Sequence, residues 1–519
     1  MRKELDLVLS PQDAAEPARL SARIAQELGL EPSRITAVRV LRRSVDARRQ
    51  HIVVNLRVLA VADEAAPAFE TTHFDFPDVS AKDPVIVVGA GPAGLFAALR
   101  LIELGFKPIV LERGKDVSER KRDIALIHRE HALNPESNYC FGLGGAGTFS
   151  DGKLYTRSKK RGDNRRTLEL LHFHGASDAI LYEAHPHIGS DRLPKIISNF
   201  RETIQRAGGK ILFGTRVTGF TTRDQTVTGV TTQQGEAIDG RAVILATGHS
   251  ARDIYEILHS ANLALEAKAF AMGVRIEHPQ SLINEIQYHR DPQMPFLPPA
   301  AYNLVQQVAG RGVYSFCMCP GGFIVPASTA PEETVVNGMS PSLRNSPFAN
   351  SGLVVEIRTE DLGAYAAEGP LAGLRFQQAL EHEAFRHSGG GQTAPAQRVT
   401  DFVAGRASAD LPETSYIPGL YQSPLHAWLP RAIGPRLREG LKAFERKMRG
   451  FLTREAVLVG VESRTSSPVR IPRDRETLQH IQLKGLYPCG EGAGYAGGIL
   501  SSAIDGENCA SAAAAWIKS

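Results

Sequence analysis

The sequence predicts an α/β protein with a parallel sheet, an inserted mixed β-sheet and a small α+β module at the N-terminus. Three observations predict this class. A strand, a glycine-rich turn, a helix and a second strand follow one another between residues 84 and 112. Two more apolar strands that run into glycine-containing turns lie far downstream, at 243–248 and 485–493. Between them come many strand-like runs, which are typical of a mixed sheet.

The composition is that of an ordinary globular chain. The 519 residues are 42% hydrophobic and 22% charged, which excludes wholesale disorder. The 60 Lys and Arg against 56 Asp and Glu leave a formal charge of +4, so no global field favours nucleic acid or an anionic membrane. Five cysteines exclude a disulfide scaffold. Because neither a signal peptide nor a membrane-spanning run is expected, we predict a cytoplasmic protein without a membrane partner.

Residues 1–76 are predicted to form the small α+β module. Alternating leucines near the start predict a strand, and apolar residues at helical spacing predict a helix over 16–28 that stops at Gly29. Two more strands are expected at 35–41 and 52–60.

Arginines gather in this module, with one acid, Asp46, among them. A patch for nucleic acid or another polyanion is one interpretation. The alternative, a solvated hairpin face, is favoured because charged runs on strands commonly lie in water. The arginines are Arg34, Arg39, Arg42, Arg43, Arg48, Arg49 and Arg57.

The turn after the first apolar strand has the pattern G-x-G-x-x-G, which in this context predicts dinucleotide binding. Gly89 makes the tight turn, Gly91 lets the backbone approach a pyrophosphate, and Gly94 lets helix and strand pack closely. The helix that begins at Pro92 and Ala93 offers free N–H groups and partial positive charge to the phosphates.

Glu112 ends the second strand of this unit, about 20 residues after the turn, as the dinucleotide fingerprint requires. Its carboxylate would accept hydrogen bonds from both ribose hydroxyls and would repel a 2′-phosphate. Arg113, the next residue, is predicted to border the same ligand.

The downstream strands indicate which dinucleotide is bound. One strand ends in Ala246-Thr247-Gly248, and another ends in Gly490-Glu491. Together with the opening unit they resemble the FAD-binding domain of the glutathione-reductase-like flavoprotein superfamily, with a Rossmann-like fold. The resemblance implies FAD, bordered by Thr247 and Gly248. It also implies that Glu491, where Asp is commoner, holds the ribityl and pyrophosphate part.

Two further positions are assigned by the same resemblance. The helix after Gly498 and Ile499 would point its N-terminus at the flavin. Val217, at the end of the predicted strand 210–217, matches the place where the superfamily passes its backbone beside the adenine.

A second G-x-G-x-x-G, at 142–147, does not follow a buried strand and does not precede an acid-ended one. A second nucleotide fold is therefore not predicted, and NAD(P)H is expected to visit only transiently. Gly144 and Gly145 are instead expected to lie against the flavin ring, with Thr148 as a hydrogen-bond donor; a plain loop is the alternative.

Four longer segments look like a family of uncharacterised FAD-dependent dehydrogenases, or NAD(P)/FAD-dependent oxidoreductases, of bacteria and plastids. They are 43–48, 312–322, 462–470 and 490–498, and the match spans essentially the whole chain. The resemblance implies FAD and redox chemistry, and it implies no settled substrate.

The chain thus divides into four predicted segments. Residues 1–76 form the module, 84–262 the first part of the FAD-binding domain, 263–455 the inserted substrate domain, and 456–519 the second part of the FAD-binding domain. Within the insertion, the Gly-, Pro- and Ser-rich stretch 388–424 predicts a long loop or lid.

Cys317, Cys319 and Arg464 are the catalytic candidates. Residues i and i+2 on a strand face the same way, roughly 6.6 Å apart. A disulfide needs Cβ atoms ~3.5–4.5 Å apart, so a redox pair requires a break in the strand; small core side chains are the alternative. Arg464 is expected to be a fixed cation near the flavin, or else part of a salt bridge. Two cysteines are too few for structural zinc, so no metal is predicted.

These observations favour an FAD-dependent oxidoreductase that moves hydride through flavin N5, with a small-molecule substrate docked against 312–322. A flavin monooxygenase of a small ring compound is the second interpretation. A non-catalytic or RNA-associated flavoprotein is the third.

Overall fold

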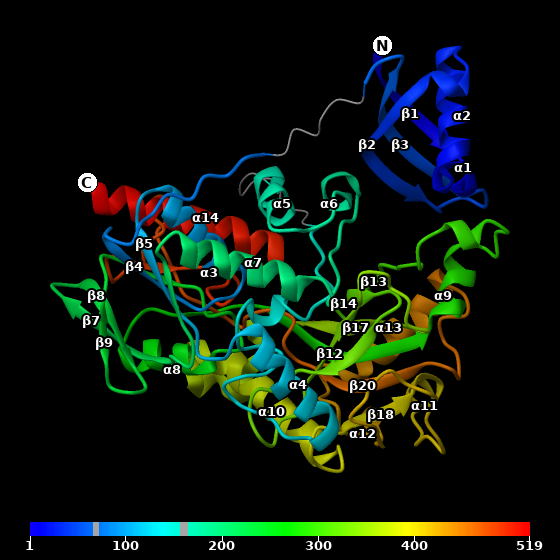
Figure 1. Ribbon diagram of the computed structural model, residues 1–519. Helices are drawn as coiled ribbons and strands as arrows, with labels where there is room; N and C mark the ends of the chain where they lie inside the picture. Colours follow the sequence, from blue (N-terminus) through cyan, green and yellow to red (C-terminus); the bar gives the residue numbers. More distant parts are fainter. Residues whose placement is uncertain (66–71, 156–163) are drawn as a thin grey trace.

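The computed structural model describes residues 1–65, 72–155 and 164–519. Residues 66–71 and 156–163, which belong to the predicted module and FAD-binding segment, lie outside the described part. The chain forms a small N-terminal module, a parallel-sheet domain and a mixed-sheet domain (Figure 1).

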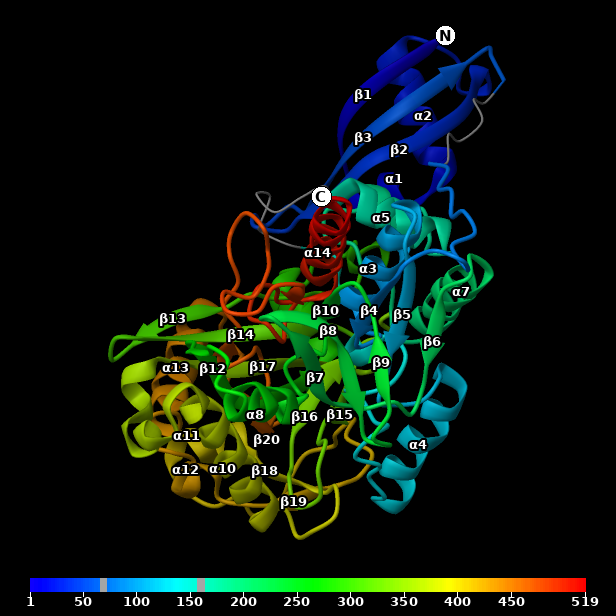
Figure 2. The ribbon, with the colours of Figure 1, turned by 90° about the vertical axis from the view of Figure 1, so that its left-hand side faces the viewer.

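The N-terminal module has the predicted strand–helix–strand–strand order, in an antiparallel sheet of order β1-β3-β2. The long helix stops at Gly29, as the sequence predicts, and this glycine takes the left-handed conformation. The module projects from the rest of the chain (Figure 2). Its contacts with the rest include the Ala184 amide, which donates to the Arg43 carbonyl, and the Gln12 amide, which donates to the Gln293 side chain. Its elements are β1 (Arg2–Leu9), α1 (Pro11–Ala15), α2 (Pro17–Leu28), η1 (Pro32–Arg34), β2 (Ile35–Asp46) and β3 (Val53–Ala62).

The parallel sheet has the order β22-β10-β4-β5-β6, so a strand from the C-terminal end completes a sheet begun far upstream. The parallel sheet is thus built from two stretches of chain that lie far apart in the sequence. The last helix, α14, packs against α3, which follows the glycine-rich turn (Figure 1). The elements are β4 (Pro84–Val88), α3 (Pro92–Glu103), β5 (Lys107–Leu111), α4 (Val117–Glu130), α7 (Leu193–Arg206), β6 (Lys210–Leu212), β10 (Val243–Leu245), β22 (Leu486–Pro488) and α14 (Ile499–Lys518).

Smaller elements surround this sheet, and three of its neighbours form an antiparallel sheet of order β7-β8-β9. The smaller elements are η2 (Gly145–Gly147), α5 (Asn164–Phe173), α6 (Ala179–Tyr182), β7 (Val217–Arg223), β8 (Thr226–Thr232), β9 (Ala237–Asp239) and α8 (Arg252–Ser260).

The mixed sheet has the order β13-β14-β17-β12-β20-β18-β19. Its elements are β12 (Phe270–Pro279), β13 (Val305–Val308), β14 (Arg311–Cys319), β17 (Phe348–Ile357), β18 (Ala394–Arg398), β19 (Leu420–Gln422) and β20 (Val457–Glu462), and α10 (Ala372–Arg386) and α13 (Gly434–Lys447) pack on it. Smaller pieces are β11 (Glu266–Ala267), α9 (Gln280–Gln287), η3 (Met294–Phe296), β15 (Phe323–Pro326), β16 (Val336–Met339), η4 (Thr359–Leu371), α11 (Val399–Ala404), α12 (Leu425–Trp428) and β21 (Val469–Arg470).

Two predicted boundaries are wrong. The second FAD-binding part was expected from 456, yet β20 pairs with β12 and β18 inside the mixed sheet. All six of its residues are buried, and β12 and β18 pair with its two edges inside the mixed sheet. The expected lid at 388–424 instead contains β18, α11 and β19, because its glycines and prolines separate short elements.

None of the helices in the described ranges is long and apolar enough to cross a bilayer.

Candidate active site

A large cavity lies where the C-terminal ends of the parallel strands meet the mixed sheet. This is the edge at which open parallel sheets bind their ligands. It gathers most of the residues predicted around a cofactor, from segments far apart in the chain. These are Gly89, Gly91, Pro92, Ala93, Glu112, Arg113, Gly145, Val217, Thr247, Gly248, Glu491, Gly498 and Ile499, together with Cys317, Cys319 and Arg464.

The three glycines of the first turn differ in their surroundings. Gly89 has φ +102°, a conformation that favours glycine. A Cβ at Gly91 would meet no atom within 4 Å, so this position opens on the cavity. A Cβ at Gly94 would lie 1.9 Å from the Gly89 carbonyl oxygen, so this glycine does not line the cavity and serves helix–strand packing.

Two helices begin at the cavity. Pro92 and Ala93 start α3, and Gly498 and Ile499 start α14. The first backbone N–H groups of a helix have no partner within it and carry partial positive charge. The cavity is therefore prepared for an anionic group such as a pyrophosphate.

Glu112 is held in place by backbone amides. Oε2 accepts from the Ala90 amide at 2.9 Å, and Oε1 accepts from the Gly114 and Gly142 amides, each at 2.9 Å. A carboxylate has about four acceptor sites, so one remains for a ligand hydroxyl. Two ribose hydroxyls, as the sequence analysis expected, would need two free acceptor sites on this carboxylate, and one is free.

We expect Glu112→Gln to weaken FAD binding at least about tenfold, a change of roughly 1.4 kcal/mol. In glutamine an NH2 group replaces one carboxylate oxygen. This group donates hydrogen bonds, so it cannot accept from the backbone amides that face it. Fluorescence titration of the cofactor-free protein with FAD measures the dissociation constant. Glu136→Gln, which changes a half-exposed acid paired with Arg113, is the control and should change it less than twofold.

The second glycine-rich loop forms η2 instead of a strand-to-helix turn, and Gly145 lines the cavity. A Cβ at Gly145 would lie 3.1 Å from the Gly91 Cα, so the two loops meet closely. The expectation for Thr148 is wrong: its side chain is fully buried, and the hydroxyl donates to the Leu143 carbonyl at 2.7 Å. Gly144 also lies outside the lining, with its amide donating to Ala90.

Arg120 organises this loop, and the sequence does not reveal it. The side chain is fully buried and donates to the backbone carbonyls of Asn138, Tyr139, Leu143 and Gly145. Burial lowers the pKa of Arg120 to about 10, which still leaves it charged at neutral pH. An arginine in a polar helix looks like a surface residue, so no local pattern marks it.

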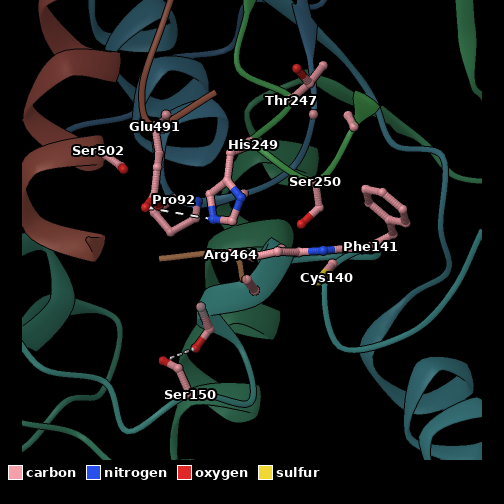
Figure 3. Close-up of a pocket in the computed structure, with 18 of the residues that line it drawn as sticks. Pro92, Cys140, Phe141, Ser150, Thr247, His249, Ser250, Arg464, Glu491 and Ser502 are labelled. Atoms are coloured by element: carbon pink, nitrogen blue, oxygen red, sulfur yellow. Dashed lines mark hydrogen bonds and ion pairs between the residues drawn. The ribbon is translucent and has the colours of Figure 1, made fainter. Parts of the chain in front are cut away.

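Glu491 faces His249 across the cavity (Figure 3), with 3.8 Å between Oε1 and the imidazole Nε2. Burial raises the pKa of Glu491 to about 7, against the opposing charge of Lys268. Burial and the nearby Arg464 and Arg252 lower the pKa of His249 to about 4, so its imidazole is neutral at pH 7. His249 was missed from the sequence, although it directly follows Ala-Thr-Gly.

Arg464 lies in a salt bridge, which is one of the two alternatives that the sequence left open. Its guanidinium lines the cavity but binds Glu333 at 2.7 Å and Glu381 at 2.8 Å. Arg252 binds the same two carboxylates, which gives a buried cluster of two arginines and two glutamates. The four formal charges cancel, so the cluster fixes structure and supplies little net charge to a ligand.

Cys317 and Cys319 both line the cavity without a bridge between them. A bulge after Phe316 breaks the strand, and Cys317 takes φ +43°. As a result Cys317 is exposed to the cavity, whereas the buried Cys319 thiol donates to the Cys317 carbonyl. The two thiols therefore do not face the same way, and the geometry favours a lining role for Cys317.

The sequence analysis missed three polar residues that line this wall. They are Lys153, Asn337 on β16 and Glu462 at the end of β20. Lys153 is bound to Asp151 and donates to the Met318 carbonyl. We call Cys317, Asn337 and Glu462 the sheet wall.

Within the described residues, Cys489, Asp505 and Cys509 form one group with metal-ligating atoms close together. Arg473 donates to Asp505 and to the Cys509 sulfur, the latter at 3.3 Å. Its guanidinium therefore takes the place that a metal ion would need.

The arginine-rich module is partly neutralised. Arg34 pairs with Asp63, Arg48 with Asp46 and Arg57 with Asp6, while Arg43 faces Glu183 at 3.7 Å. These pairs favour the solvated face over a polyanion patch; a nucleic-acid partner remains a prediction.

Family models match along the chain in the order of its parts. A model described as FAD binding domain matches residues 82–130, FAD dependent oxidoreductase matches 192–278, and FAD-dependent protein, C-terminal domain-like, matches 269–465. A domain of unknown function matches 1–61. An uncharacterized protein of Clostridium beijerinckii is 41% identical over 508 residues, which cover 94% of each chain.

The chain belongs to the FAD-dependent oxidoreductase family. Among solved structures, it is similar to a geranylgeranyl bacteriochlorophyll reductase-like protein of Thermoplasma acidophilum, with 13% identity and a TM-score of 0.36 over 84% of this chain and 79% of that one. It is also similar to CtdE in complex with FAD, with 12% identity and a TM-score of 0.30 over 83% and 82%.

The residues of this oxidoreductase fit FAD on their own geometry. The open space beside Gly91, the free acceptor site of Glu112 and the two helix N-termini are complementary to a pyrophosphate and a ribose.

Proposed function

We propose that the protein is an FAD-dependent dehydrogenase or reductase that moves hydride between a small-molecule substrate and the flavin N5. The single observation that supports it is the cavity itself, because it joins the dinucleotide-binding turn to the sheet wall. FAD supplies the redox step by accepting or donating two electrons with a hydride. Gly91, Glu112 and the two helix N-termini would hold the cofactor, and the sheet wall would orient the substrate.

NAD(P)H is proposed as a transient visitor only. Of the two glycine-rich motifs, the one at 89–94 lies between a strand and a helix, whereas the other forms η2. The first would hold FAD, so a nicotinamide donor would have to enter and leave the same cavity.

The test is to purify the protein, record its visible spectrum and add NADH and NADPH separately without oxygen. Bleaching by either donor supports a reductase with a transient nicotinamide donor. Bleaching by neither supports a dehydrogenase that is reduced by its own substrate. Oxygen uptake coupled to a hydroxylated product would support the monooxygenase interpretation instead.

A further inference from the structure

The sheet wall contains a buried carboxyl with unusually few hydrogen bonds. Glu462 ends β20, is 3% exposed and lines the cavity. Its one protein donor among the described residues is Nη1 of Arg275, at 3.1 Å from Oε2 and 3.4 Å from Oε1. Buried charged groups normally have all their partners, so the rest of this carboxyl's acceptor capacity is left for what enters the cavity.

Other buried glutamates of the mixed-sheet domain are fully engaged. Glu277 on β12 accepts from the Thr414 hydroxyl at 2.7 Å, and from the Ser415 amide and hydroxyl. Glu381 accepts from Arg252, Ser463 and Arg464. Neither lines the cavity. Glu462 differs from both in having few donors and in facing the cavity.

The residues around Glu462 hold its side chain in place and leave acceptor sites of its carboxyl free. Arg275 also donates to the Asn350 side chain and to the Cys317 carbonyl at 2.9 Å, so its guanidinium is fixed from several sides. Asn337 Oδ1 accepts from Arg275 at 3.3 Å and from the Gly338 amide. The Asn337 Nδ2 group has no acceptor among the described residues, and this exposed side chain lines the same wall.

We propose that Glu462 exchanges with the substrate the proton that accompanies hydride transfer, and that Asn337 donates a hydrogen bond to the substrate atom involved. The proposal rests on the proposed function and deepens it. The substrate class is then a compound whose reacting carbon bears a hydroxyl or amine, or the matching carbonyl or imine.

The step balances in atoms and charge. In the oxidative direction the substrate C–H bond breaks and its hydride, with two electrons, goes to the oxidised flavin. The O–H or N–H bond breaks, and the proton goes to the Glu462 carboxylate. A C=O or C=N bond forms, and the Glu462 carboxyl later releases its proton to water. Reduction of a carbonyl or imine runs the same changes in reverse.

Charges near Glu462 are consistent with this role. Burial raises the pKa of Glu462 to about 7, although Arg275 and Lys153 oppose the shift. Two titratable groups near it, Cys317 and Lys153, do not change protonation near neutral pH. Desolvation inside the cavity raises the pKa of the Cys317 thiol to about 11, and Cys319 and Asp151 outweigh burial to raise the pKa of Lys153. Glu462 therefore has both protonation states available at neutral pH.

The test follows the visible flavin bands and the infrared carbonyl band of a protonated carboxyl in the FAD-loaded protein between pH 5 and 9. We expect a transition near pH 7 that shifts the flavin bands, is reduced in Glu462→Gln, is absent when Glu491→Gln is added to that variant, and persists in Glu277→Gln. Glu491 is the other cavity carboxyl with a pKa of about 7. The Glu491→Gln variant removes its titration and should leave the Glu462 transition in place. Because Glu462→Gln leaves Arg275 without its anion, Glu462→Asp is the second variant, and it should move the transition instead of reducing it.

An unchanged transition in Glu462→Gln and Glu462→Asp would overturn the proposal, as would a yellow wild-type protein without any transition. A colourless protein that takes up no FAD would instead overturn the proposed function, so the two failures are distinguishable.

Discussion

Gly91→Val is expected to give a folded, colourless protein. The new side chain would enter the open space of the cavity, since a Cβ there meets no protein atom within 4 Å. It would occupy the approach to the pyrophosphate and weaken FAD binding by about 100-fold or more, roughly 3 kcal/mol. Gly91 has φ −74°, which any residue adopts, so the melting temperature of the cofactor-free protein should change little.

Gly94→Val is the matched partner of that experiment. Its Cβ would lie 1.9 Å from the Gly89 carbonyl oxygen, so the turn or the helix must move. We expect this variant to lose about 3 kcal/mol or more of unfolding free energy, as overpacked positions do. A yellow Gly91→Val protein, or a Gly94→Val protein as stable as wild type, would contradict the roles assigned to the two glycines.

Arg464→Met is expected to lower the free energy of unfolding by about 3–5 kcal/mol, because it leaves two buried carboxylates with Arg252 alone. Arg470→Met is the matched control. Its side chain is 43% exposed, and its guanidinium lies 3.7 Å from Glu266, so its loss should cost under about 1 kcal/mol. Urea denaturation measures both, and equal losses would contradict the buried cluster.

The same cluster predicts a pH dependence. Burial alone would raise the pKa of Glu381, but Arg252 and Arg464 outweigh it and lower this pKa well below its ordinary value. A lowered carboxyl pKa contributes stability above the unfolded pKa of about 4.3, and this contribution is lost as the pH falls below it. Wild-type stability should therefore fall below about pH 4, and Arg464→Met should show a shallower fall. Equal slopes would contradict the assignment.

Local patterns account for what the sequence predicted well. The turn at 89–94 lies inside one strand–helix–strand unit, so its geometry follows from neighbours in the chain. The N-terminal module and Gly29 were predictable for the same reason. The split of the parallel sheet was predictable because its strands at 243–245 and 486–488 are each an apolar run followed by a glycine-containing turn, as in the first strand of the sheet.

The features that the sequence analysis missed depend on partners far away in the chain. β20 looks like any buried strand, and only its pairing with β12 and β18 assigns it to the mixed sheet. Arg464 was correctly expected at the cavity, but its neutralisation depends on Glu333 and Glu381, more than 80 residues away. Glu462 escaped notice because a carboxylate at a strand end is ordinary in sequence and exceptional only through its few donors.

The central claim is that the cavity binds FAD, and the visible spectrum of the purified protein tests it most directly. We predict a yellow protein with flavin bands, or a colourless one that becomes yellow on adding FAD and binds one FAD per chain. A colourless protein that takes up no added FAD would contradict the assignment of the cavity.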